Sequence, residues 1–433
     1  MINEHLKHNL IDEFIISVIP VLLGNGTRLF KEGRTEQELE FVEAKTFETG
    51  LTQLHYRQKN KQLITEDYYI SFKINDVKDI LIGVFILTFT LSYSQIKKVE
   101  EVIDSSVKKD NFNGAVLLAQ NGKTELLSYK GLADRHYNIN FSDDTRFHIF
   151  SLTKTFTAVL IMQLYQKGKI NLDATISTYY PEYKGEAAQK ATIKNLLTYS
   201  SGRENKDIST TEFIHKAYDN TIWDLDDFIN TYLSEKLIDK PGTKFSYNNG
   251  DYILLGKIIE KIYKKSFEEV LKEQILIPLK MQNTGILHHN DIVKNIDDGY
   301  SADESDPFLL HTPTNTYIDN FYSAGAMYST PKDMLIFDQA IFNNILIKKS
   351  TLDLMLTPLR NLEDTALGFW VYPKSFGKMS TLFVERQGEG YGHSANWVHL
   401  PEKKLTLIIL SNTKDIKYLN KMRERVISAY YGQ

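Results

Sequence analysis

The spacing of apolar and polar positions divides most of the chain into a strand-rich start, a helical middle and a strand-rich end. Helical periodicity covers residues 96–108, and two strand patterns over 114–129 flank Asn121-Gly122, a dipeptide typical of a tight hairpin turn. A mainly helical, loop-rich stretch extends from about residue 170 to 345. An amphipathic helix is expected over 416–430, after strand patterns at 367–372, 382–386, 397–400 and 405–411. Strands at both ends with helices between them predict an α+β fold, in which helices flank one antiparallel sheet and a large helical insertion interrupts it.

A nearly all-apolar helix is predicted directly after the first hairpin. Residues 147–158 read Phe-His-Ile-Phe-Ser-Leu-Thr-Lys-Thr-Phe-Thr-Ala, and apolar residues continue at 159–162 and 164. Because this helix is apolar on nearly every side, we expect it to be buried in the middle of the domain. Ser151 and Lys154 share a face at its N-terminal end. A buried lysine loses affinity for its proton and can serve as the base for a serine, while the helix N-terminus offers N–H groups to a developing oxyanion.

The first 94 residues have a different character. Residues 1–58 combine helix and strand patterns and indicate a small partial α/β fragment, and residues 59–76 form a polar linker. The apolar run at 80–91 is twelve residues long, whereas a membrane-spanning helix needs about 20. We therefore predict that this run does not form a stable membrane span. A separate domain is expected to begin after it and to cover residues 95–433.

Residues 77–94 have the features of a secretory signal, although a buried strand or helix remains the alternative. Lys78 precedes the apolar run, and the small residues Ser92 and Ser94 suit a cleavage site after Ser94. Such signals stand at an N-terminus, so we expect the functional product to begin near Val77. The domain that follows is then periplasmic or secreted, and otherwise it stays in the cytoplasm.

The amino-acid composition restricts the possible chemistry, whereas it says little about the fold. The chain has 433 residues, 42% of them hydrophobic, and a net charge of −4, which is typical of a folded globular protein. So mild a charge gives no indication of a nucleic-acid surface or a polybasic membrane patch. Without cysteine there is no thiol nucleophile, no disulfide and no thiolate metal site. Serine is therefore the first nucleophile to consider.

Further motifs share the domain with Ser151. Ser-x-x-Lys alone is a weak signal, because it occurs seven times in the chain. Tyr247-x-Asn249 stands 96 residues after Ser151, and His393 follows 146 residues after Tyr247 in the glycine-rich stretch 390–397. This order and spacing are far more specific than any one motif. A lysine and a tyrosine both titrate near 10 when unperturbed, so placing them together is one way to bring them toward neutral pH.

In this order, the motifs at Ser151, Tyr247 and His393 resemble those of the serine β-lactamase and penicillin-binding-protein superfamily. The resemblance spans residues 96–415 and favours the branch of class C β-lactamases, DD-peptidases, D-aminopeptidases and related esterases. It is supported by the stretches 196–202, 241–247 and 323–334. It implies a β-lactamase/transpeptidase-like fold and a serine hydrolase that forms a covalent acyl-enzyme, without a metal or an organic cofactor. D-amino-acid peptides, small esters and β-lactams remain open as substrates, because the helical insertion supplies the pocket lining.

The resemblance also implies a role for each motif residue. Ser151 would be the acylated nucleophile, and Lys154 would share in its deprotonation. Tyr247 would act as general base and then as acid toward the leaving group, while Asn249 would bond the substrate amide and steady the lysine. The backbone N–H groups of Ser151 and Asn396 would form the oxyanion hole, where one lost donor typically costs about 10²–10³ in rate.

His393 occupies the place of the third motif of that superfamily, usually Lys-Thr-Gly or His-x-Gly. Here the triplet is His393-Ser394-Ala395, so alanine replaces the usual glycine, and Ser394 and Ala395 are expected to line the substrate site. A Cβ at this strand edge would crowd the substrate. The departure keeps open a second hypothesis, a catalytically idle member of the superfamily that binds peptides or a partner protein.

Residues 1–58 resemble a different family, through the segments 19–30 and 50–56. They are similar to the C-terminal end of the dihydrofolate-reductase-like domain of riboflavin-biosynthesis reductases, and cover about the last third of such a domain. The glycine pair that holds the cofactor in that family lies upstream of the part present. Gly24 and Gly26 are interpreted as turn residues. The fragment is therefore not expected to bind NADPH.

Two rival hydrolase hypotheses fail on the sequence. The stretch Gly392-His-Ser-Ala-Asn396 differs at one position from the nucleophile-elbow pattern Gly-x-Ser-x-Gly, with Ser394 as the nucleophile. An elbow leads into a helix, however, whereas the residues that follow here have a strand pattern. His399 is moreover the sole histidine downstream of it. A zinc hydrolase lacks support because the chain has no His-Glu-x-x-His, and His288-His289 has no usable ligand spacing.

Overall fold

The computed structural model describes residues 13–18, 39–46, 52–58, 77–204, 215–219, 221–303, 306, 308–313 and 316–432. The chain divides into two compact units, residues 1–81 and 82–433, each considered by itself. In the first, β1 (Glu13–Val18), β2 (Leu39–Thr46) and β3 (Thr52–Gln58) form an antiparallel sheet in the order β1-β3-β2. All three strands fall within residues 1–58, where strand patterns were expected. Gly24, Gly26 and the linker 59–76 lie outside the described residues.

Helix α2 (Val77–Asp110) contains both the segment with signal-like features and the helix expected over 96–108. The boundary between the two compact units falls within it. Its residues Val99 and Ile103 are buried in an apolar core of the second unit. Among the described helices, none combines the length and the apolar character needed to cross a membrane.

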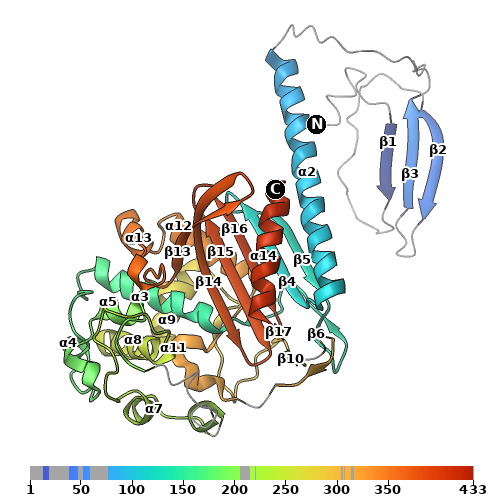
Figure 1. Cartoon of the computed structure of the whole chain (residues 1–433). Helices are drawn as coiled ribbons and strands as arrows, with labels where there is room; N and C mark the ends of the chain where they lie inside the picture. The colour runs from blue at the N-terminus through green and yellow to red at the C-terminus, as the bar shows by residue number, and fades with distance from the viewer. Residues whose placement is uncertain are drawn as a thin grey trace. The chain divides into compact units, whose positions relative to one another are not determined.

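The second unit is built on a six-stranded antiparallel sheet in the order β13-β14-β15-β16-β4-β5 (Figure 1). Its strands come from the two ends of the unit: β4 (Gly114–Gln120), β5 (Lys123–Lys130), β13 (Trp370–Phe376), β14 (Met379–Gly390), β15 (His393–Leu400) and β16 (Leu405–Ser411). Asn121 and Gly122 join β4 to β5 with φ values of 52° and 75°, the left-handed conformation that a tight hairpin turn requires. The predicted α+β fold is confirmed.

Strands β14 and β15 are longer than their apolar patterns indicated. The patterns at 382–386 and 397–400 belong to these strands, which extend toward each other as far as Gly390 and His393. The extensions are rich in glycine and polar residues and show no apolar alternation, so periodicity does not reveal them. They matter because the extended end of β14 lies beside the candidate nucleophile.

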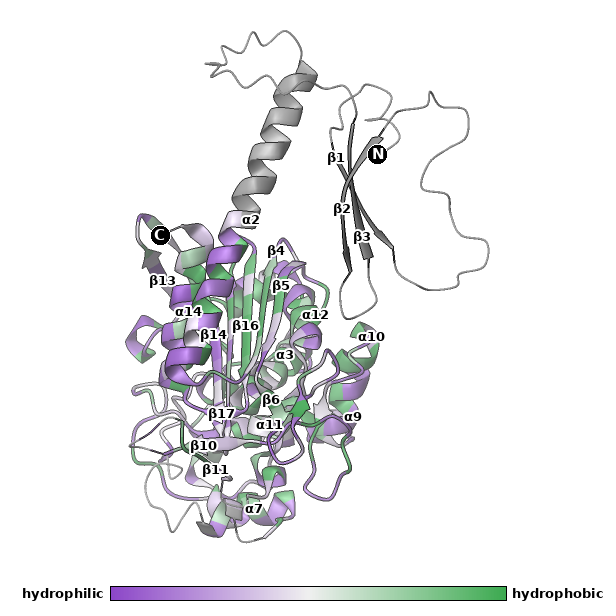
Figure 2. Ribbon diagram, turned by 90° about the vertical axis from the view of Figure 1, so that its right-hand side faces the viewer, coloured by the Kyte–Doolittle hydropathy of each residue, from purple (hydrophilic) through white to green (hydrophobic). Residues whose placement is uncertain are grey.

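Helices cover both faces of this sheet. On one face, α2 and α14 (Ile416–Tyr431) share an apolar core with Leu407 of β16 (Figure 1). On the other face, α3 (Thr153–Gln166) and α12 (Pro331–Phe342) share a core with Ile408. Successive residues of a strand point to opposite faces, so β16 contributes to both cores. Figure 2 accordingly shows β4 and β16 mainly in green, whereas α14 carries both purple and green residues.

The region between β5 and β13 is mainly helical, as predicted. Besides α3 and α12 it contains α4 (Ile176–Tyr179), α5 (Ile193–Leu197), α7 (Leu225–Tyr232), α8 (Asn249–Tyr263), α9 (Phe267–Leu271), α10 (Ile277–Leu279), α11 (Tyr322–Gly325) and α13 (Lys349–Met355). Short 3₁₀ or π turns are η1 (Phe150–Leu152), η2 (Glu186–Gln189), η4 (His215–Asp219), η5 (Lys272–Leu276), η6 (Ile318–Phe321) and η7 (Arg360–Leu362). Short strands form three small sheets: β6 (Leu132–Asp134) with β7 (Ile139–Asn140); β8 (Phe147–His148), β12 (Met327–Ser329) and β9 (Gly285–Ile286); and β11 (Leu310–His311), β10 (Tyr300–Ala302) and β17 (Thr413–Lys414).

Candidate active site

Ser151 lies in η1, which leads directly into α3. Most of α3 is buried, as expected of a central apolar helix, and Lys154 stands in its first turn with 0% exposure. Phe150, just before Ser151, has a φ of 42°, an uncommon conformation for a residue with a side chain. Its ring lies so close to Gly390 that a Cβ there would be 2.1 Å away. Such strained residues persist where their surroundings enforce them, often at active sites.

The ammonium group of Lys154 donates to three acceptors. They are Ser151 Oγ at 2.9 Å, Asn249 Oδ1 at 2.6 Å and the backbone oxygen of Ala324 at 2.8 Å. An ammonium group has three protons, so this arrangement suits a charged lysine. Asn249 is the first residue of α8, and it therefore connects the catalytic helix to the helical insertion. The contact expected between Asn249 and the lysine is present.

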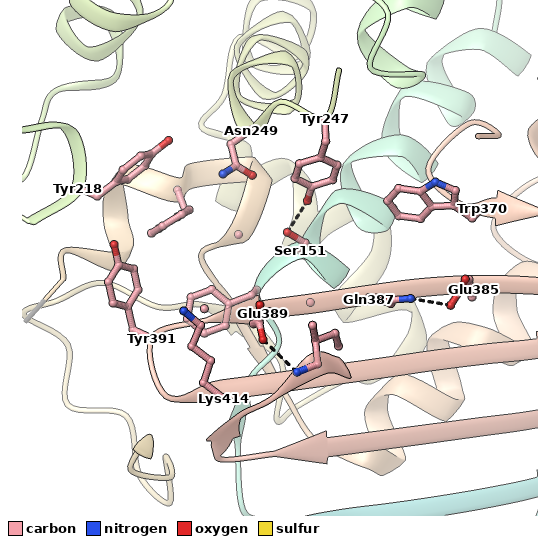
Figure 3. A pocket seen from close by; sticks show the side chains of 16 residues that line it. Ser151, Tyr218, Tyr247, Asn249, Trp370, Glu385, Gln387, Glu389, Tyr391 and Lys414 are labelled. Atoms are coloured by element: carbon pink, nitrogen blue, oxygen red, sulfur yellow. Dashed lines mark hydrogen bonds between the residues drawn. The ribbon is translucent and has the colours of Figure 1, made fainter. Parts of the chain in front are cut away.

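Tyr247 stands two residues before α8 and contacts the same serine. Its hydroxyl donates to Ser151 Oγ at 2.7 Å (Figure 3). Burial acts to raise the pKa of this phenol, but the charges of Lys154 and Arg386 outweigh it and lower the pKa below its ordinary value of 10.0. A phenol with a lowered pKa accepts a proton more readily near neutral pH. The structure thus brings Ser151, Lys154, Tyr247 and Asn249 together, as their order in the sequence predicted.

Arg386, which the sequence motifs did not indicate, is a fully buried cation at the same site. Its Nη2 donates to the Tyr247 hydroxyl at 3.4 Å, and its Nε donates to the backbone oxygen of Ser151 at 2.9 Å. The guanidinium carbon lies 4.8 Å from the centre of the Trp370 ring and 5.7 Å from that of Tyr199. Arginine stays protonated at every ordinary pH, so it supplies a fixed positive charge beside the phenol.

The end of β14 has a free edge toward the nucleophile. Strand β13 pairs with β14 only up to Glu385, so within the described part of the chain no strand covers residues 386–390 on that side. Gly388 is required here, because a Cβ would lie 2.3 Å from the Ile149 oxygen and 3.1 Å from the Ser151 nitrogen. The backbone of β14 therefore approaches the Ser151 N–H closely, which suits an oxyanion site made of backbone donors.

The placement of the third motif at His393 needs correction, because this residue is buried and does not line the pocket of Ser151. Its Nε2 lies 3.0 Å from Asp297 Oδ1 and its Nδ1 lies 3.0 Å from the backbone oxygen of Tyr391. Its ring stacks on that of His148 at 4.5 Å. Burial acts to lower the pKa of His393, but the Asp297 carboxylate outweighs it and raises the pKa above 6.5. His393 thus supports the turn between β14 and β15.

Ser394, Ala395 and Asn396 also stand away from the pocket, since β15 lies between β14 and β16 in the sheet. The Ser394 hydroxyl accepts the Asp415 N–H at 2.8 Å, and the Asn396 side chain donates to Asn420 at 2.7 Å. An interior strand directs its N–H groups to its neighbours, so Asn396 is not placed to bind an oxyanion. Ala395 does not line the cavity, so the structure gives no support to the crowding that had suggested an idle protein.

The triplet beside Ser151 is instead Arg386-Gln387-Gly388, one strand earlier. It has a cation followed two residues later by glycine, which is the pattern sought at the third motif. Arg386 stands seven residues before His393, at the end of the strand pattern 382–386. The glycine at the third position of the motif could have identified the correct triplet from the sequence, because Arg386-Gln387-Gly388 has it and His393-Ser394-Ala395 does not.

A cavity of about 700 Å³ is lined by Ser151, Tyr247 and Asn249, the end of β14 and a set of aromatic side chains (Figure 3). This volume is in the range of small-molecule sites. The aromatic lining consists of Phe150, Tyr218, Phe321, Trp370 and Tyr391. Two exposed charged residues, Glu389 and Lys414, line the same cavity.

Potential metal ligands gather at Asp134, His136 and Asp298, whose ligand atoms all lie within 4.8 Å of one another. These residues do not line the pocket, and His136 and Asp298 are exposed. The chemistry at Ser151 draws on none of them. His288, which has no zinc-like sequence spacing, lies against Asp319 and Glu268.

The fold and the lysine–tyrosine pair around a serine define a serine hydrolase of the β-lactamase and penicillin-binding-protein type. The chain belongs to the β-lactamase family, whose model matches residues 99–431. Residues 1–53 match the RibD C-terminal domain, which confirms the resemblance found for the N-terminal fragment.

The relatives and solved structures agree with this assignment. The teichoic acid D-alanine hydrolase of Staphylococcus aureus is 30% identical over 238 residues, 55% of this chain and 55% of that protein. A putative penicillin-binding protein of Bacillus subtilis (strain 168) is 28% identical over 287 residues, 66% of this chain and 69% of that protein. The chain thus spans about half the length of the first relative.

Two solved structures show the same fold. FmtA from Staphylococcus aureus aligns with a TM-score of 0.65 and 23% identity, over 78% of this chain and 87% of that one. The D-amino acid amidase from Ochrobactrum anthropi SV3 aligns with a TM-score of 0.67 and 21% identity, over 78% of this chain and 99% of that one.

Proposed function

We propose that residues 95–433 hydrolyse D-amino acid esters, amides or short peptides through a covalent acyl-enzyme at Ser151. One observation carries the proposal: Ser151 Oγ accepts hydrogen bonds from both the Tyr247 hydroxyl at 2.7 Å and Lys154 Nζ at 2.9 Å. A serine hydroxyl becomes a nucleophile when an adjacent group can take its proton. Small esters and β-lactams share the acyl carbon that such a serine attacks, and they belong in the same substrate screen.

In the acylation step, Tyr247 in its phenolate form takes the proton of Ser151 as Oγ attacks the acyl carbon. Lys154 and Arg386 stabilise that phenolate by their positive charges. The Ser151 N–H and the free edge of β14 near Gly388 bind the oxyanion. The carbon–oxygen or carbon–nitrogen bond of the leaving group then breaks, and Tyr247 returns the proton to the departing atom.

Deacylation repeats the same sequence with water. Tyr247 removes a proton from a water molecule, whose oxygen attacks the ester carbon, and the bond to Ser151 Oγ breaks. The proton passes from Tyr247 to Oγ, so the free serine is restored. In the free protein Lys154 Nζ has three hydrogen-bond acceptors around it, which suits a group that stays charged and holds Asn249 in place.

The choice of D-amino acid derivatives rests on the relatives. One carries the name teichoic acid D-alanine hydrolase, and the fold is shared with a D-amino acid amidase and with a D-stereospecific amidohydrolase from Streptomyces. The cavity volume of about 700 Å³ suits an aminoacyl group with part of its leaving group.

Labelling with a fluorophosphonate tests the nucleophile. Wild-type protein should be labelled, and the label should disappear in Ser151→Ala. Ser394→Ala is the matched control, since Ser394 is the nucleophile of the rival elbow hypothesis, and this variant should still be labelled. A screen of D-alanine esters, D-amino acid amides, D-Ala-D-Ala peptides and nitrocefin then identifies the substrate. Loss of labelling in Ser394→Ala, or its persistence in Ser151→Ala, would contradict the assignment.

The proposal extends to the compartment. Residues 77–94 would act as a secretory signal that exports the hydrolase domain, since the family match begins at residue 99, just after this segment. N-terminal sequencing of protein produced in its native host tests this. A mature chain that starts near Gln95 supports export, whereas a mature chain that starts at Met1 contradicts it.

A further inference from the structure

Glu389 contributes to the cavity of Ser151 a carboxylate that the proposed reaction does not use. It follows Gly388, whose Cβ position is 3.1 Å from the Ser151 nitrogen, on the free edge of β14. The residue is exposed and lines the cavity. In Figure 3 its side chain lies across the cavity from Tyr247 and Asn249.

One hydrogen bond fixes the position of this carboxylate. Its Oε1 accepts the backbone N–H of Ile416, the first residue of α14, at 3.0 Å. Its Oε2 has no hydrogen-bond partner among the residues that the structure describes. A carboxylate can accept several hydrogen bonds, so Glu389 retains a free acceptor oxygen while Oε1 is held by Ile416.

The other acid on this strand is already neutralised. Glu385 contacts Arg423 in a buried ion pair and accepts from the Tyr372 hydroxyl at 2.6 Å. It also accepts from Gln387 at 3.0 Å. Glu389 has no such cation within the described part of the chain, and it is the acid at the cavity with capacity for a positive charge from the substrate.

The aromatic lining favours the same kind of group. Tyr218, Phe321 and Tyr391 line the cavity, with the rings of Tyr218 and Phe321 stacked at 4.4 Å. The faces of aromatic rings attract cations, and they also bury the apolar part of a small side chain.

From these contacts we propose that Glu389 determines specificity by binding the α-ammonium group of an aminoacyl substrate. The inference rests on the proposed acyl-enzyme at Ser151 and adds that the acyl group has a free, positively charged amine. In an aminoacyl ester of Ser151, the amine is attached to the carbon next to the acyl carbon. The ammonium group would donate to Oε2 of Glu389, while Oε1 keeps its bond to Ile416. N-blocked acyl groups lack this interaction.

The test compares two substrates that differ only in the charge of the amine, D-alanine p-nitroanilide and N-acetyl-D-alanine p-nitroanilide. The readout is the ratio of their kcat/KM values, normalised to the fraction of protein that a fluorophosphonate labels. Wild-type protein should prefer the free amine. Glu389→Gln, which keeps an acceptor for Ile416, should lower the ratio about 10- to 100-fold, because a hydrogen bond to a charged group is replaced by a neutral one.

Two variants serve as controls. Glu389→Asp keeps the charge and should retain part of the preference. Lys414→Gln removes the opposite charge from the same cavity and should not lower the ratio, which separates a contact with Glu389 from a general change in cavity charge.

The outcomes distinguish this inference from the function on which it rests. An unchanged ratio in Glu389→Gln, or a wild-type preference for the N-acetyl substrate, overturns the role of Glu389 while hydrolysis at Ser151 stands. Absence of labelling and of hydrolysis in wild-type protein overturns the proposed function, and the role of Glu389 with it.

Discussion

Replacing Arg386 by glutamine should move the acidic limb of the pH–rate profile to higher pH. In the wild-type site, burial acts to raise the pKa of Tyr247, and the charges of Lys154 and Arg386 bring it below 10.0. The base is the deprotonated phenol, so activity rises as pH passes through this pKa. Removing one of the two cations raises the pKa, and more alkali is then needed for the same fraction of phenolate.

The size of the effect follows from the distance between the charges. Arg386 Nη2 lies 3.4 Å from the Tyr247 oxygen. Two unit charges at that distance interact by about 5 kcal/mol at an effective dielectric of 20, and by about 1.2 kcal/mol in water. These energies correspond to about 3.5 and 1 pKa units. Because Tyr247 borders an open cavity, we expect a shift in the lower half of this range, about one to two units.

The assay is kcat/KM for a D-alanine ester measured between pH 5 and 10. Arg386 also donates to the Ser151 backbone oxygen at 2.9 Å, so the maximal kcat/KM should fall as well. The pH at the midpoint of the acidic limb is independent of that maximal value. Arg386→Lys is the matched control, because it keeps the charge and should shift the limb less. If Arg386→Gln folds, as judged by its melting temperature, and its acidic limb coincides with that of wild type, the proposed electrostatic role of Arg386 is refuted.

Three further predictions concern the strands beside the site. Gly388→Ala should reduce activity and lower the melting temperature, at a cost of about 1–3 kcal/mol from overpacking against η1; an active variant of unchanged stability would mean that η1 does not rest on β14. Ala395→Gly, at the position paired with Gly388 on β15, should leave the relative rates on D-alanine esters, peptides and nitrocefin unchanged, and a broadened substrate range would return Ala395 to the site. Asp297→Asn should lower the pKa of His393, because the Asp297 carboxylate is the main group that opposes the effect of burial. NMR titration of the His393 ring measures the shift, and an unchanged value would show that Asp297 does not control it.

The parts of the site that the sequence predicted are those set by short-range geometry. Ser151 and Lys154 are three residues apart where η1 leads into the apolar helix α3, and helical spacing places them on one face. Tyr247 and Asn249 stand at the start of the next apolar helix, α8, so their motif also lies at the end of a recognisable element. The hairpin at Asn121-Gly122 and the strand over 405–411 were likewise readable from local pattern.

The parts that were not predicted depend on which strand lies next to the nucleophile. Strand order is a property of the whole sheet, and the apolar pattern of β14 ended at Arg386, four residues before the strand itself ends. A histidine in a glycine-rich turn was therefore a more visible signal than Arg386. The strand register shows which triplet lies next to the nucleophile. Gly388 on β14 is paired with Ala395 on β15, and only Gly388 lies against η1.

The burial of Arg386 links the position of the third motif to the chemistry at Ser151. A charged residue in a strand pattern ordinarily indicates a solvent-facing position, yet Arg386 has 0% exposure. Its acceptors among the described residues are the Ser151 backbone oxygen and the Tyr247 hydroxyl, and its Nη1 has no partner. Burying a guanidinium without a carboxylate is costly, and a phenolate at Tyr247 would supply the missing negative charge. The same buried charge that the fold must accommodate therefore favours the deprotonated tyrosine that the acyl transfer requires.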